Sequence, residues 1–157
     1  MVLTPFLAGA QIAELDANAR AAGNMKPLAV AIGDKVFATA WPAEVTQVAA
    51  DGFLGHVIVG VRVSGVKFHE RLTAAQFRTE VDRLVRLVFA NSPVVEEVDV
   101  WATVPIPVPR GAIVSGPYAI PTTRPVFTIA VRRGTDPAAA QTFWDEEWSR
   151  TAFKQGP

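Results

Sequence analysis

The clearest hydrophobic pattern in the chain runs from His56 to Ser64, where apolar and polar side chains alternate. Val57 and the next three odd-numbered positions are all valine. Strict alternation with β-branched residues on one side is typical of a half-buried strand. The stretch Glu97–Val104 alternates in the same way and predicts a second strand with one face toward the core.

Between these strands, Thr73–Asn91 has the 3.6-residue period of a helix. Its apolar stripe consists of Phe77, Val81, Leu84, Val85, Val88 and Phe89. Thr73 and Gln76 form a capping box at the start, and Ser92-Pro93 ends the helix. A helix of this length can serve as a crossover, which allows the two strands to lie parallel in one sheet.

The N-terminal part predicts smaller elements. Gln11–Ala22 has a helical composition. Gly33-Asp34 predicts a tight turn between two strands, Pro27–Ile32 and Lys35–Trp41. Glu44–Ala50 fits either another strand or a helical turn.

Two further elements are expected toward the C-terminus. Val126–Arg132 alternates as a strand, and Asp136-Pro137 supplies the N-cap and first position of a final helix. The apolar side of that helix contains Phe143, Trp144, Trp148 and Phe153. The predicted fold is α+β, with residues 11–157 as one domain. A mixed or antiparallel sheet carries the long helix 73–91, and the C-terminal two thirds has the order β-α-β-β-α.

A proline-rich segment separates the last two strands. Six prolines fall between Pro105 and Pro125, and proline removes ladder donors and fixes φ, so no regular central strand or helix is expected there. The segment is nevertheless apolar, with Ile113 and Tyr118 among its side chains. We expect an ordered, extended loop that lies over the sheet or against a partner, with a hairpin near residues 112–115. Long loops of this kind are commonly functional.

Composition narrows the function classes. Half of the 157 residues are hydrophobic and 19% are charged, as in globular proteins. Lys and Arg balance Asp and Glu at 15 each, so no bulk attraction to nucleic acid or anionic membranes is expected. The absence of cysteine excludes disulfides, thiolate catalysis and Cys-ligated zinc. No apolar run in the sequence is long enough to span a bilayer.

The first ten residues are apolar and uncharged, and they end in Ala8-Gly9-Ala10. This resembles the end of a secretory signal segment with its small-residue cleavage site, although a basic stretch ahead of it is missing. We therefore expect an extracytoplasmic protein, exported or tethered through residues 1–10. The alternative is a cytoplasmic protein with an ordinary apolar N-terminus.

The candidate catalytic residues are His69 and Glu70, and His56 is the only other histidine. Their spacing matches no zinc-binding pattern, so we predict neither a metal site nor a cofactor. The sequence also lacks a Gly-x-Ser-x-Gly elbow and the glycine motifs that cradle phosphates.

Three charged groups offer alternative sites. The carboxylates 145–147 beside two tryptophans suggest carbohydrate chemistry. Consecutive helical positions diverge by about 100°, however, which favours a solvated face. The acidic run 96–99 lies next to Trp101, where a cation or basic partner could bind, although an exposed strand face is the simpler interpretation. Four arginines offer an anion site near the proline-rich segment: Arg110, Arg124, Arg132 and Arg133.

These patterns leave three functional hypotheses. The first is a non-catalytic binding or assembly module that uses residues 105–125 to bind a protein partner or a second copy. Its candidate binding residues are Trp101, Arg110, Tyr118 and Arg124. The second is a small hydrolase-like enzyme using carboxylates and His69. The third is a nucleic-acid-binding βαβ module, which the lack of a basic surface disfavours.

Overall fold

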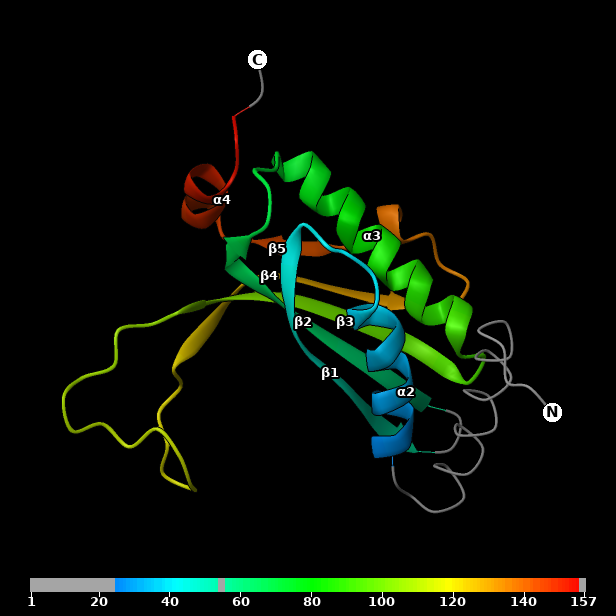
Figure 1. Ribbon diagram of the computed structural model, residues 1–157, viewed down its shortest axis with the longest axis horizontal. Helices are drawn as coiled ribbons and strands as arrows, with labels where there is room; N and C mark the ends of the chain where they lie inside the picture. The colour runs from blue at the N-terminus through cyan, green and yellow to red at the C-terminus, as the bar shows by residue number, and fades with distance from the viewer. Residues whose placement is uncertain (1–24, 54–55, 156–157) are drawn as a thin grey trace.

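The computed structural model describes residues 25–53 and 56–155, which form one α+β domain built on a five-stranded sheet (Figure 1). The strands are β1 (Ala43–Phe53), β2 (His56–Phe68), β3 (Val95–Pro105), β4 (Thr123–Arg132) and β5 (Thr142–Trp144). The helices are α2 (Lys26–Phe37), α3 (Ala74–Asn91), the short 3-10 helix η2 (Pro137–Ala139) and α4 (Glu146–Ala152). The predictions for residues 1–10 and Gln11–Ala22 lie outside the described residues.

The strands lie in the sheet in chain order. β2 and β3 are parallel, and every other neighbouring pair is antiparallel, so the sheet is mixed as predicted. α3 is the crossover between the parallel strands. Its capping box is confirmed, because the Gln76 backbone N–H donates to Thr73 Oγ1 at 3.1 Å and the Thr73 N–H donates to Gln76 Oε1 at 2.9 Å.

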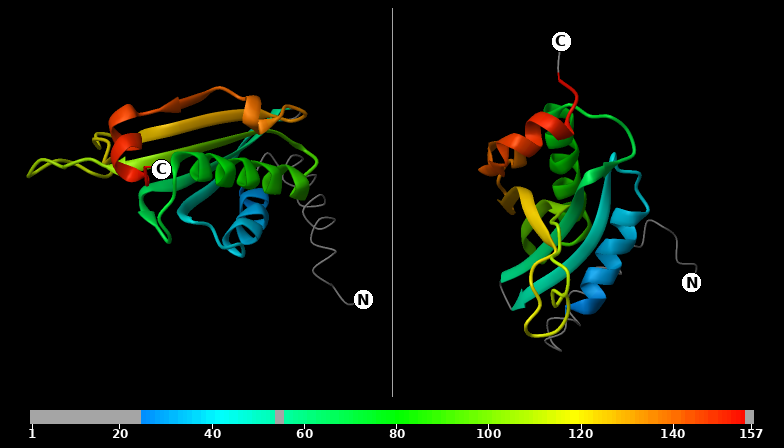
Figure 2. Two further views of the ribbon diagram at one scale, coloured as in Figure 1. Left: turned by 90° about the horizontal axis from the view of Figure 1, so that it is seen from above. Right: turned by 90° about the vertical axis from the view of Figure 1, so that its left-hand side faces the viewer.

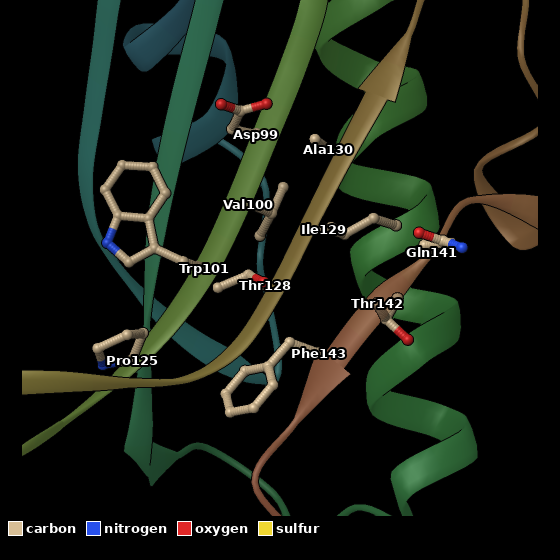
Figure 3. Close-up of a pocket in the computed structure, with 10 residues that line it drawn as sticks. All are labelled: Asp99, Val100, Trp101, Pro125, Thr128, Ile129, Ala130, Gln141, Thr142 and Phe143. Carbon is tan, nitrogen blue, oxygen red and sulfur yellow. The ribbon is translucent and has the colours of Figure 1, made fainter.

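α2 and α3 cover the same face of the sheet (Figure 1 and Figure 2). The predicted apolar faces meet there: the valines of β2 and the buried stripe of α3 belong to one hydrophobic core. The buried α3 residues are Phe77, Val81, Leu84, Val85 and Val88. The opposite face carries no helix in the described part of the chain, and α3 lies behind the sheet when that face is viewed (Figure 3).

The prediction of two strands over Pro27–Ile32 and Lys35–Trp41 is wrong, because α2 occupies most of this region. Leu28, Ile32 and Val36 recur every four residues and are fully buried, which is the pattern of a helix face. Gly33 makes no turn; it is buried, and a Cβ added there would lie 3.8 Å from Val48 of β1. The ambiguous stretch Glu44–Ala50 belongs to β1.

The single C-terminal helix predicted after Asp136 is also wrong. Asp136 caps only η2, β5 then pairs with residues 127–129 of β4, and Asp145 caps α4. This path places three of the predicted aromatic residues around the N-terminal end of α3. The closest centroid distances in this cluster are Phe127–Trp144 at 4.7 Å, Trp148–Phe153 at 4.9 Å and Phe77–Phe127 at 5.2 Å.

The proline-rich segment contains no strand from residue 106 to residue 122, which we call the arm. Pro105 ends β3. Pro125 lies within β4 at a point that β5 does not reach, so the outer edge of β4 is unpaired there and tolerates proline. The arm does not lie over the sheet but projects beyond its end (Figure 1). The arm has two turns, one closed by Ala112 N–H on the Pro109 carbonyl with Gly111 at φ of 83°, and one closed by Ala119 N–H on the Gly116 carbonyl with Gly116 at φ of 86°. The bond from Ile120 N–H to the Ile113 carbonyl closes the chain reversal, which extends beyond the predicted residues 112–115.

Candidate functional site

The open face of the sheet is organised around Trp101 of β3. The strand register places Arg62, Trp101, Thr128 and Phe143 in one cross-strand row. The Trp101 ring extends over β2, where a Cβ on Gly60 would come within 2.8 Å of ring atom Cζ3. Gly60 therefore allows the indole to lie against the sheet with its other surface outward. Figure 3 shows this ring spread along the face.

Asp99 lies beside this ring, because its register partner on β2 is Gly60. The Asp99 Oδ1 atom is buried and accepts no hydrogen bond from any described residue. Burial raises the pKa of Asp99 to about 6. The Glu97 carboxyl contributes through hydrogen bonding, which requires a proton on one of the two groups, and through charge repulsion. The open face thus holds an acidic pair next to an aromatic surface.

An open groove of about 790 Å³ runs along this face from Asp99 and Trp101 to β5 (Figure 3). Phe143, which we predicted on the apolar side of a helix, forms the β5 side of the groove and is 50% exposed. Thr128 and Gln141 add a hydroxyl and an amide. The groove therefore combines apolar surface with a few polar groups, as ligand and partner sites usually do.

The arm begins next to this groove, since Pro125 lines the groove and follows the arm directly. Its base is closed by a hydrogen bond from Ile106 N–H to the Thr122 carbonyl at 2.9 Å, and Ile120 N–H donates to the Ile113 carbonyl at 2.8 Å. Large apolar side chains of the arm are exposed: Val108, Ile113, Val114, Tyr118 and Ile120. Tyr118 is 81% exposed, the largest value among the exposed large hydrophobic residues of the described chain.

The four predicted binding residues divide between these features. Trp101 lies in the groove, and Arg110 and Tyr118 lie on the arm. Arg110 forms no hydrogen bond or ion pair within the described residues. Arg124 already forms an ion pair within its own chain, because its Nη1 atom lies 2.9 Å from Asp145 Oδ2. The hydrogen bond from the Trp148 backbone N–H, and then this arginine, lower the pKa of Asp145, the N-cap of α4.

The candidate catalytic residues lie elsewhere. His69 and Glu70 follow β2 and are exposed beside a cavity of about 380 Å³ that also touches Trp41, Glu80 and Arg83. Glu80 lies 2.7 Å from Arg83, so its carboxylate already has an ion-pair partner. His56 starts β2 and His69 follows its end, so the length of the strand separates the two histidines. The structure does not bring His69 into the groove that holds Asp99.

The four arginines likewise do not form one group. Arg133 packs over the Phe89 ring at 4.8 Å and donates to the Val95 carbonyl at 2.7 Å, while Arg132 lies 3.9 Å from Glu97. Sequence reasoning missed Gly60 and the exposure of Phe143 as parts of the site. An isolated glycine inside a strand pattern, which signals close approach by another group, was the available clue for Gly60.

No family model matches the chain, and neither the curated proteins nor the solved structures include a significant match. Within residues 25–53 and 56–155, no helix is long and apolar enough to cross a membrane. In the same residues, no group of three or more His, Asp or Glu side chains is placed to hold a metal ion.

Proposed function

We propose that this protein is a non-catalytic binding or assembly module that holds a protein partner through the arm and the adjoining groove. The distribution of exposed apolar side chains carries this proposal. Five of the nine large hydrophobic residues exposed in the described chain lie on the arm. Exposed large apolar side chains gathered on one segment mark an interaction site more often than single residues scattered over the surface do.

The composition of the arm supports the same function. Prolines reduce the conformational entropy that the arm loses on binding, and they make it a poor template for strand aggregation. The side chains Trp101, Tyr118 and Arg110 belong to the three residue types most enriched among those that dominate binding energy at interfaces.

Site-specific photo-crosslinking in the source organism tests this function. A photoreactive amino acid replaces Ile113 on the arm, and the matched control places it at Ala138, which is exposed on η2. We expect a discrete protein adduct from position 113 and none from position 138, with mass spectrometry identifying the adduct. An arm that yields no adduct, or the same adducts as position 138, would contradict the proposal.

The proposal includes an extracytoplasmic location, supported by the apolar residues 1–10 and their Ala8-Gly9-Ala10 ending. Fusion of the full chain to alkaline phosphatase, which is active only after export, tests this part separately. An inactive fusion that accumulates in the cytoplasm would limit the proposal to a cytoplasmic module.

A further inference from the structure

The arm and the open face of the same chain have complementary chemistry. The arm is apolar and carries a single charge, Arg110. The groove presents the Trp101 and Phe143 rings together with the Asp99 carboxyl, while the neighbouring Glu97 already lies 3.9 Å from Arg132. A guanidinium placed beside a carboxylate and an aromatic ring gains both a charge-assisted hydrogen bond and a cation–π contact.

We propose that the arm of one copy docks in the open-face groove of a second copy, with Arg110 beside Asp99 and Tyr118 on the Trp101 ring. This inference rests on the proposed binding function and names its partner. Arg110 forms no hydrogen bond or ion pair within the described part of its own chain, and the Asp99 carboxyl lines the groove beside the Trp101 ring. The contact between copies gives the Arg110 guanidinium both a carboxyl and an aromatic ring.

The position of the arm favours a second copy over closure onto its own face. The arm leaves the sheet at the end where Pro125 lines the groove, and it points away from the sheet (Figure 1). A two-fold axis is the commonest symmetry of oligomers. Two copies related by such an axis can each extend an arm over the groove of the other. The formal net charge of zero means that no long-range repulsion opposes this approach.

The size of the two surfaces suits a stable contact. The arm spans residues 106–122, and ten residues line the groove. In a reciprocal dimer each copy contributes both surfaces. Each side then approaches the roughly 20–30 residues of a standard protein interface.

Sedimentation equilibrium of the purified full chain provides the first test. We expect dimers or larger assemblies for the wild type. Either Arg110→Glu or Asp99→Lys should raise the dissociation constant roughly tenfold or more. Combining both substitutions in one chain should restore much of the association, because the charges are exchanged. Val30→Ser is the control, since Val30 on α2 is as exposed as Val114 on the arm, at 54% against 55%.

Mixing two defective variants provides the second test. Tyr118→Ser damages the arm, and Phe143→Ser damages the groove; both side chains are at least half exposed, so the fold should survive, which circular dichroism checks. Each variant alone should be monomeric, whereas an equal mixture should form a heterodimer through the intact arm of one variant and the intact groove of the other. A monomeric wild type, or association that all these substitutions leave unchanged, would overturn the inference. A monomer whose arm still crosslinks to a different protein in cells would leave the proposed function intact.

Discussion

The two faces of the sheet are built from alternate residues of the same strands, yet their chemistry is opposite. On the covered face, Val59 and Val98 are fully buried beneath the helices. The next positions on the open face are Gly60 and Asp99, which hold an aromatic ring and an acidic group instead of a packed core.

This difference singles out Asp99 on the open face. Aspartate is unfavourable inside strands, and an ionised Asp99 is further disfavoured by its partly buried position. Local choices that weaken a fold without an evident structural gain are characteristic of functional sites. The covered face therefore accounts for the stability of the fold, and the open face has the local features of a functional site.

The largest effect is expected on the covered side. Val85→Asp places an unpaired carboxylate where the side chain is fully buried, so the free energy of unfolding should fall by roughly 4 kcal/mol or more. Thr79→Asp, at an exposed position of the same helix, should cost no more than about 0.5 kcal/mol. Urea denaturation measures both, and similar losses would show that α3 does not pack on the sheet as described.

A smaller effect on stability is expected where the Trp101 ring lies over β2. Gly60→Ala places a methyl group against the Trp101 ring, which should lower the free energy of unfolding by about 1–2 kcal/mol. In the Trp101→Ala background the same change meets no ring, so the loss should disappear. Equal losses in both backgrounds of this double-mutant cycle would show that the ring does not lie over Gly60.

The raised pKa of Asp99 should make the stability of the fold depend on pH. With its pKa raised to about 6, folded Asp99 binds its proton more tightly than the unfolded chain does. Its contribution to stability is therefore present at low pH and is lost as the pH rises from about 4 to about 6.

Asp99→Asn removes this dependence. At pH 7 the free energy of unfolding of the variant should exceed that of the wild type by about 1 kcal/mol, after allowance for solvent screening. This difference in stability should vanish below about pH 4. Asp34→Asn, at an exposed carboxylate on α2, serves as the control and should leave the wild-type profile unchanged. Denaturation curves across this pH range check the sign, and a difference that grows toward low pH would contradict it.

The smallest effect is expected at His69, which is exposed and outside the groove. His69→Ala should leave the melting temperature, the metal content and the self-association unchanged. Loss of bound metal or of a newly found activity on this substitution would favour the enzyme hypothesis instead.

The sequence predicts the covered face much better than the open one. Periodicity alone identifies α3, β2 and β3, because their buried positions repeat at regular intervals. It fails for β5, a three-residue strand that exists through pairing with β4. It also gives no direct sign that Trp101 lies over Gly60, because that contact joins two strands through the sheet register.

The most direct test of the contact between copies is paramagnetic relaxation enhancement across the interface. The chain has no cysteine, so Ala119→Cys carries one spin label on the arm and leaves Tyr118 intact. The spin-labelled protein is mixed with wild-type protein that is ¹⁵N-enriched and carries no spin label. In the ¹⁵N-enriched copy, the amide signals of Thr128, Ala130 and Thr142 should broaden strongly, while those on the solvent side of α3 should not. Broadening that is absent, or equal on both faces of the sheet, would contradict docking of the arm on the open face.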